Sequence, residues 1–153
     1  MNLSKDARAP TALVSEALLS MQFRTPRVLY IEDHEDTREL VTLLLSQRSY
    51  EVVTGSTIES GIELAHAQRF DLYLLDSWLP DGSGLELCQK IRQFDKTTPI
   101  LFYSAAAYAS DHEMALQCGA QGYLIKPSQP SDLCRLVSEL IENSRRLWTQ
   151  AAH

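Results

Sequence analysis

Five short runs of strand-forming, mostly apolar residues are spaced along the chain, and segments with helical periodicity lie between and after them. The runs span 28–31, 51–54, 72–75, 100–103 and 123–125, of which the second is the weakest. The intervening segments carry an apolar residue every three to four positions, as at 133–141. Because the stronger runs are continuously apolar rather than alternating, we expect strands covered on both faces, as in a parallel sheet flanked by helices.

This alternation predicts one doubly wound α/β domain with a five-stranded parallel sheet at residues 26–142. Helix starts are expected at two capping boxes, formed by Ser56 with Glu59 and by Ser110 with Glu113. Gly119 is expected to end a helix. The helices should therefore cover both faces of the sheet.

Residues outside this domain form two short extensions. The N-terminal extension, residues 1–25, carries apolar residues on one helical face and predicts a short docking helix, with a frayed tail as the alternative. Residues 143–153 predict a continuation of the last helix that carries the apolar pair Leu147 and Trp148. This pair is expected to be covered by residues 13–21 or by a partner chain, with a loose helix end and Trp148 lying on its own domain as the alternative. These two segments are candidates for self-association or for docking of a partner.

Composition restricts the classes of function. The chain has 153 residues and a formal net charge of -6, the wrong sign for general phosphate-backbone binding, so no direct nucleic-acid contact is expected. Its three cysteines form no CxxC pair, which favours a reducing compartment. No apolar run approaches the ~20 residues of a membrane span, and the N-terminus lacks the order of a signal peptide. We therefore expect a cytoplasmic protein without membrane insertion.

Polar residues stand directly after the predicted strands, where open α/β sheets bind ligands. Glu32 and Asp33 follow the first strand, Asp76 the third, Ser104 the fourth and Lys126 the fifth. Crowded carboxylates need a compensating cation, and hard oxygen ligands suit Mg²⁺. Asp76 could then act as a nucleophile toward a phosphoryl group whose oxygens are held by the cation, Lys126 and Ser104.

These residues stand in motifs that resemble bacterial two-component response-regulator receiver domains of the CheY-like type. The matching pieces are VLYIED at 28–33, LLDSWLPDGSGLEL at 74–87, Ser104-Ala, and GYLIKP at 122–127. The resemblance implies a flavodoxin-like fold with strand order 2-1-3-4-5. Ser104 stands where the family more often has threonine, which puts in doubt the strength of the switch but not phosphorylation.

The resemblance also implies roles for individual residues. Asp76 would become an aspartyl phosphate by transfer from a phosphohistidine on a sensor histidine kinase or a histidine phosphotransfer protein. Asp33, Asp76 and the backbone carbonyl of Trp78 would bind Mg²⁺, and Glu32 would act through a metal-bound water. Ser104 would follow the phosphate, Tyr123 would turn inward behind it, and the Lys126-Pro127 peptide is expected to be cis.

The main alternative is an interaction module of receiver fold that works without phosphorylation. A haloacid-dehalogenase-type phosphatase is excluded because Trp78 stands where that chemistry needs a second acid, and a nucleotide enzyme lacks its glycine-rich first turn. The chain is therefore expected to be a signalling domain whose only catalysis acts on its own Asp76. Output is expected through a homodimer, a downstream protein or a further phosphotransfer partner. Asp81 is assigned to turn geometry, and His34 is a lesser candidate for the phosphoryl entrance.

Overall fold

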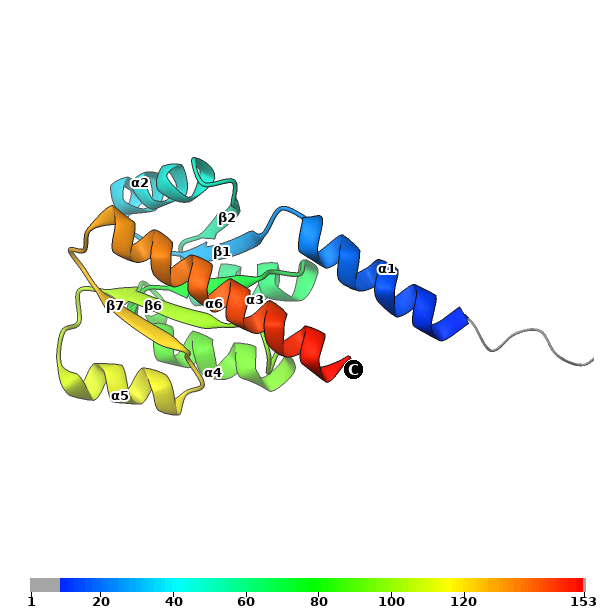
Figure 1. Cartoon of the computed structure of the whole chain (residues 1–153). Coiled ribbons are helices and arrows are strands. Elements are labelled where there is room, and N and C mark those ends of the chain that lie inside the picture. Colours follow the sequence, from blue (N-terminus) through cyan, green and yellow to red (C-terminus); the bar gives the residue numbers. More distant parts are fainter. Residues whose placement is uncertain (1–8, 153) are drawn as a thin grey trace, which may run out of the picture.

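One parallel sheet organises the protein. A computed structural model describes residues 9–152. Its five strands are β1 (Arg27–Ile31), β2 (Glu51–Gly55), β3 (Leu72–Leu75), β6 (Ile100–Ser104) and β7 (Gly122–Ile125). They lie in the order β2-β1-β3-β6-β7, which confirms the predicted five-stranded topology (Figure 1). An additional antiparallel hairpin, β4 (Trp78–Leu79) with β5 (Gly82–Ser83), was not predicted, because two-residue strands leave no periodic pattern.

Helices cover the sheet on both faces. The helices α2 (Glu35–Ser46) and α6 (Pro130–Ala151) pack on one face, where Tyr30, Leu74 and Leu101 are fully buried with Val137. On the other face lie α3 (Ile58–Ala67), α4 (Gly84–Phe94) and α5 (Ala109–Gln117). Phe102, Leu75 and Ile31 bury there with Leu87 and Ile91. Residues alternate along each strand between the two cores, which explains why the strand runs are continuously apolar.

Two of the expected helix starts were wrong. The N-cap of α3 is Thr57, whose hydroxyl accepts from the Ser60 N–H at 3.0 Å while the Ser60 hydroxyl accepts from the Thr57 N–H, so the capping box lies one residue beyond the predicted Ser56 and Glu59. The N-cap of α5 is Tyr108 rather than Ser110, because the Asp111 carboxylate accepts from the Tyr108 N–H at 3.0 Å, whereas Glu113 lies further along α5.

Other local features agree with the sequence-based expectations. Gly119 has a φ of 99° directly after the C-cap of α5, as expected of a terminating glycine. The Lys126-Pro127 peptide is cis. All three cysteines are free; Cys88 and Cys134 are buried and Cys118 is half-buried.

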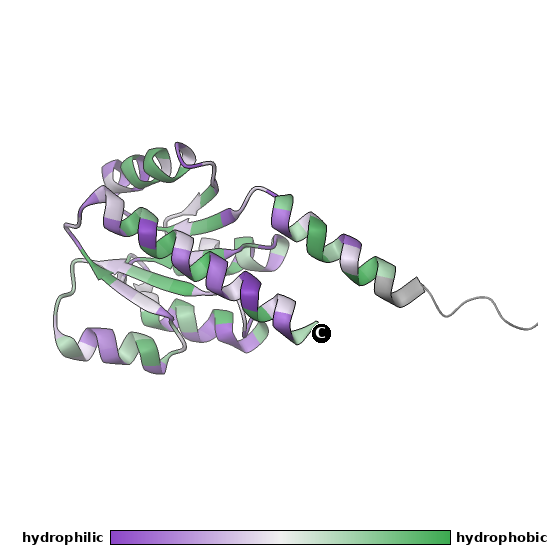
Figure 2. Ribbon diagram, in the orientation of Figure 1, coloured by the Kyte–Doolittle hydropathy of each residue, from purple (hydrophilic) through white to green (hydrophobic). Residues whose placement is uncertain are grey.

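The terminal helices extend beyond the sheet. Helix α1 (Ala9–Phe23) projects away from the domain, and α6 continues to Ala151, so that both end near the amino edge of the sheet (Figure 1). Much of α1 is coloured hydrophobic in Figure 2 although its side chains from residue 12 on are mostly exposed. Among the described residues, no helix combines the length and apolarity needed to cross a bilayer.

Candidate functional site at the carboxyl edge of the sheet

The fold brings the polar residues at the strand ends together. Glu32 follows β1, Asp76 follows β3, Ser104 is the last residue of β6, and Lys126 follows β7. Since these strands are neighbours in a parallel sheet, their carboxyl ends meet at one edge. The structure therefore collects all four residues, with Asp33, into a single site.

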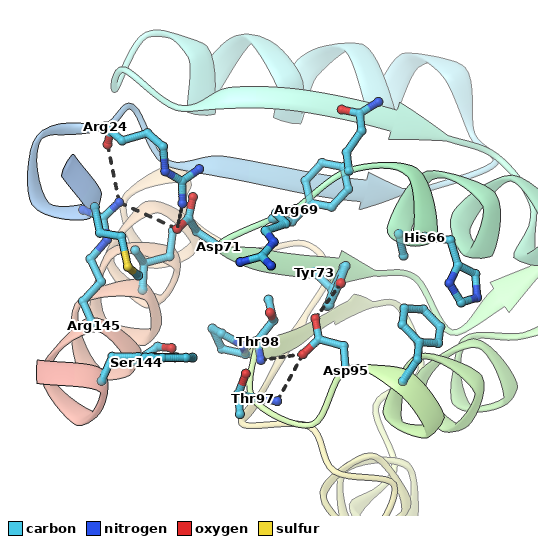
Figure 3. Close-up of a pocket in the computed structure, with 18 of the residues that line it drawn as sticks. Arg24, His66, Arg69, Asp71, Tyr73, Asp95, Thr97, Thr98, Ser144 and Arg145 are labelled. Carbon is cyan, nitrogen blue, oxygen red and sulfur yellow. Dashed lines mark hydrogen bonds and ion pairs between the residues drawn. The ribbon is translucent and has the colours of Figure 1, made fainter. Parts of the chain in front are cut away.

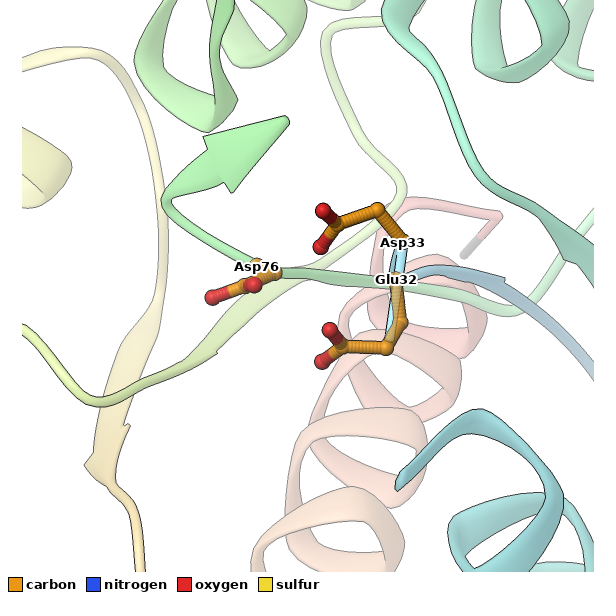
Figure 4. A group of neighbouring side chains, drawn as sticks. All are labelled: Glu32, Asp33 and Asp76. Carbon is orange, nitrogen blue, oxygen red and sulfur yellow. The ribbon is translucent and has the colours of Figure 1, made fainter. Parts of the chain in front are cut away.

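Three carboxylates form the centre of this site. One oxygen from each of Glu32, Asp33 and Asp76 lies within 4.8 Å of the others, and the three groups turn toward one space (Figure 4). Glu32 and Asp76 are only 1% and 8% exposed, whereas Asp33 faces solvent. Two buried carboxylates and one accessible carboxylate thus supply hard oxygen ligands of the kind that Mg²⁺ prefers.

Lys126 balances part of this negative charge, and most of its contact is with Glu32. Its Nζ forms a very short ion pair with Glu32 and lies 3.8 Å from an oxygen of Asp76. Glu32 also accepts from the Tyr30 hydroxyl at 3.2 Å and from the His34 N–H at 3.1 Å. Burial, with the neighbouring Glu32 carboxylate, raises the pKa of Tyr30, so this hydroxyl remains a donor.

The negative charge of Asp76 is less completely compensated by Lys126 than that of Glu32. Burial is the main cause that raises the pKa of Asp76 to about 6; Glu32 adds to the shift, while Lys126 and the Ser77 N–H, which donates at 2.8 Å, oppose it. The ionised Asp76 carboxylate therefore has too little positive charge nearby to offset the effect of its burial. The donor set and the shortage of charge fit a divalent cation.

Ser104 and Tyr123 contact the loops that follow β3 and β6. Ser104 is fully buried, and its hydroxyl accepts from the Ala106 N–H at 3.1 Å. The Tyr123 hydroxyl donates to the Ala106 carbonyl at 2.7 Å and lies 3.4 Å from the Ser77 hydroxyl. One tyrosine thus contacts the loop after Asp76 and the loop after Ser104. Its ring is half-buried and stacks on Phe102.

Comparison with known proteins decides the family. The family described as "Response regulator receiver domain" matches residues 28–138, which is well over half of the chain. The chain belongs to this family. The transcriptional regulatory protein AfsQ1 of Streptomyces coelicolor is 33% identical to the receiver over 83% of this chain and 56% of its own length. The response regulator ArlR of Staphylococcus epidermidis is 34% identical over 69% of this chain and 48% of its own length.

Solved structures agree with this assignment. The receiver domain of HemR from Leptospira biflexa is 33% identical, with a TM-score of 0.72 over 76% of this chain and 94% of its own. The receiver domain of a LuxO repressor protein from Vibrio parahaemolyticus has a TM-score of 0.80 at 25% identity, over 85% of this chain and all of its own. The receiver spans about half the length of the regulators AfsQ1 and ArlR.

Two contributors to the receiver's site were missed by the sequence analysis. A Cβ at Gly84 would lie 2.0 Å from the backbone oxygen of Asp76, so only glycine allows α4 to approach the acid this closely. The Arg38 guanidinium donates to the Glu32 carbonyl at 2.8 Å and fixes the turn after β1. Position 84 lies within the quoted LLDSWLPDGSGLEL motif, but nothing in the pattern indicated that Arg38 would bind the Glu32 carbonyl six positions earlier.

Three further residues have roles that the structure clarifies. Asp81 accepts from the Ile58 and Glu59 N–H groups at 2.8 and 3.1 Å, so it caps α3 as well as forming a turn. His34 is the N-cap of α2 and its Nδ1 lies 3.0 Å from the Thr37 hydroxyl. The Trp78 side chain is 68% exposed beside the site, and its backbone belongs to β4.

Proposed function

We propose that Asp76 accepts a phosphoryl group from a phosphohistidine on a sensor histidine kinase or a histidine phosphotransfer protein. The observation that carries this proposal is a buried carboxylate at a strand end, with a lysine 3.8 Å away and two further carboxylates, of Glu32 and Asp33, clustered beside it. A carboxylate oxygen of Asp76 forms the new P–O bond as the P–N bond to the imidazole breaks. The departing imidazole keeps the electron pair of that bond and takes a proton.

Several residues around Asp76 could each stabilise the phosphoryl oxygens in a different way. Lys126 supplies a positive charge close to Asp76, and the buried hydroxyl of Ser104 is positioned to donate once it leaves Ala106. Asp33, Asp76 and the Trp78 carbonyl would hold Mg²⁺, with Glu32 acting through a water. A bound Mg²⁺ supplies the positive charge that the carboxylates and the incoming phosphoryl oxygens require.

We further propose that phosphorylation shifts the receiver between two conformations. Movement of the Ser104 hydroxyl toward the phosphate would release its bond with the Ala106 N–H, and Ala106 is also the residue whose carbonyl accepts from Tyr123. The pair Ser104 and Tyr123 thereby links the site to the surface of α5 and β7. In this proposal residues 26–142 are the receiver unit, residues 1–25 and 143–153 are extensions, and the protein works in the cytoplasm without binding nucleic acid directly.

Intact-mass analysis with a small acyl-phosphate donor and Mg²⁺ tests the assignment. The wild-type chain should gain the mass of one phosphoryl group, and Asp76→Asn should gain none. Asp132→Asn, a change at an exposed aspartate of α6, is the matched control and should be phosphorylated like the wild type. A wild-type chain that gains no phosphoryl group, yet still binds its partner, would favour the phosphorylation-independent interaction module.

A further inference from the structure

A second cavity lies at the amino edge of the sheet, opposite the acidic site. It has a volume of about 600 Å³ and is bordered by the end of α1, the segments 65–71 and 94–99, and the last turns of α6. Figure 3 shows the side chain of Arg69 extending into it. The rim carries two exposed aromatic side chains, Phe94 at 40% and Trp148 at 52% exposure. We refer to this cavity as the amino-edge groove.

Helix α1, which begins at Ala9, has the character of a buried helix but lacks cover. The expectation of a single apolar face was wrong, because Leu19 and Phe23 lie on the other side of the helix from Val14 and Met21. Glu16 is the only charged residue between positions 9 and 23. Leu13 is 64% exposed, Leu19 50% and Phe23 84%. A helix that is apolar nearly all round is normally buried, and an isolated helix of 15 residues is only marginally stable in water. Another surface should therefore cover α1.

The connection between α1 and β1 holds the helix away from its own groove. The Arg24 guanidinium pairs with Asp71 at 2.9 Å, and the Arg27 N–H donates to the same carboxylate at 2.7 Å. Arg145 of α6 also lies 3.8 Å from Asp71. The three contacts fix the segment between the two elements, and α1 projects outward from it (Figure 1).

We propose that α1 docks in the amino-edge groove of a second copy of this chain, so that two copies exchange helices reciprocally. A two-fold pair offers one helix and one groove from each copy, so that the exposed apolar side chains of α1 meet the rim aromatics Phe94 and Trp148 in both directions. The charges are complementary: α1 carries Glu16 without any basic residue, and Arg69 in the groove has an exposed guanidinium with no ion pair among the described residues. The absence of Lys and Arg from α1 argues against an anionic membrane surface as the cover.

Light scattering on the full chain across a dilution series tests the exchange. The wild type should have twice the 17.2 kDa chain mass, and Leu19→Glu should be monomeric because it places a charge on the docked face. Leu43→Glu is the matched control, since Leu43 is a similarly exposed leucine on α2, and it should remain dimeric. A monomeric wild type, or a dimeric Leu19→Glu, would overturn the proposal.

A charge-exchange experiment identifies the contact itself. Glu16→Arg and Arg69→Glu should each weaken the dimer about tenfold, because each creates two repulsive contacts. An equimolar mixture of the two variants should regain wild-type affinity, since both contacts of the mixed dimer are then attractive. No contact within one chain could be restored by mixing. An unrestored mixture, or binding of α1 to anionic lipid vesicles in place of dimer formation, would contradict the exchange.

Discussion

At the carboxyl edge of the sheet, Asp76 receives one backbone hydrogen bond and a lysine nitrogen at 3.8 Å, whereas at the amino edge Asp71 binds two arginines and a backbone N–H. The two side chains are about equally buried, with exposed fractions of 11% for Asp76 and 8% for Asp71. One carboxylate is thus left short of partners and the other is supplied with them. The difference separates the residue that we propose is phosphorylated from a residue that holds elements together.

The pKa values of Asp95 and Asp76 show the same contrast between the two edges. Burial alone would raise the pKa of Asp95, but N–H groups of Thr98 and Thr97 and the hydroxyl of Tyr73 hold it below its ordinary value. The pKa of Asp76 is raised to about 6 because too few donors offset its burial. Functional sites commonly contain buried ionisable groups with too few partners, which lowers the stability of the fold, whereas structural sites do not.

The largest expected effect is at Asp71. Asp71→Ala should lower the free energy of unfolding by about 2–3 kcal/mol, because it leaves Arg24, Arg145 and the Arg27 N–H without their shared acceptor. Urea denaturation measures the change. Asp132→Ala removes an exposed partner of Arg135 and should cost at most about 0.5 kcal/mol. Equal losses in the two variants would mean that the amino-edge carboxylate is not structural.

Replacing each acid by its amide should have opposite effects at the two edges. At neutral pH, Asp95→Asn should lower the free energy of unfolding by about 1–2 kcal/mol, because the hydrogen bonds from Tyr73, Thr97 and Thr98 lose a charged acceptor. Asp76→Asn should raise it by a similar amount, because it removes a carboxylate whose pKa is raised. The lowered pKa of Asp95 means that its contribution exists above the unfolded-state pKa and is lost as the pH falls through the folded-state pKa. The raised pKa of Asp76 means that its cost is absent in acid and grows until the pH exceeds about 6.

Denaturation of both variants between pH 3 and pH 8 checks these signs. The advantage of Asp76→Asn over the wild type should be largest above pH 6 and vanish near pH 4, whereas the deficit of Asp95→Asn should shrink only in acid below about pH 4. Two destabilised variants at pH 7 would contradict the contrast between the edges.

The sequence predicted the carboxyl edge much better than the amino edge. Glu32, Asp33, Asp76, Ser104 and Lys126 each follow or end a predicted strand, so parallel topology alone brings them together. No comparable rule identifies the amino-edge contacts, because they join residues more than 40 positions apart on different elements, as Arg24 and Asp71 do. Periodicity reports burial along one element, and it carries no information about pairs between elements.

The sequence also failed to predict the start of α3 and the close contact at Gly84, for a related reason. The expected start of α3 was displaced by one residue because Asp81, 23 positions away, accepts from the Ile58 N–H. Gly84 is required by the Asp76 backbone oxygen, which only the folded chain brings near it. Local patterns therefore located the elements, whereas contacts between them set their boundaries.

A smaller effect is expected from the tyrosine that connects the two loops of the carboxyl edge. Tyr123→Phe should lower the free energy of unfolding by about 1 kcal/mol, since the hydroxyl loses its bond to the Ala106 carbonyl while the ring keeps its stacking on Phe102. Thermal denaturation measures this change. Tyr108→Phe, which removes the hydroxyl of an 80% exposed residue, is the control and should leave stability unaltered. A neutral Tyr123→Phe would mean that the hydroxyl contributes nothing to linking the loops.

The smallest expected effect, and the one that most directly separates the edges, is stabilisation by Mg²⁺. A cation that binds only the folded chain stabilises it by RT ln(1 + [L]/Kd), about 0.4 kcal/mol at a concentration equal to Kd. Mg²⁺ at that concentration should therefore raise the unfolding temperature of the wild type by about one degree, because it supplies charge that Lys126 does not give to Asp76. Asp33→Ala should lose this rise; since Asp33 is exposed, the change itself should leave the fold intact. Asp71→Ala should unfold earlier but retain the full rise. A rise that persists in Asp33→Ala, or disappears in Asp71→Ala, would place the cation away from the three carboxylates.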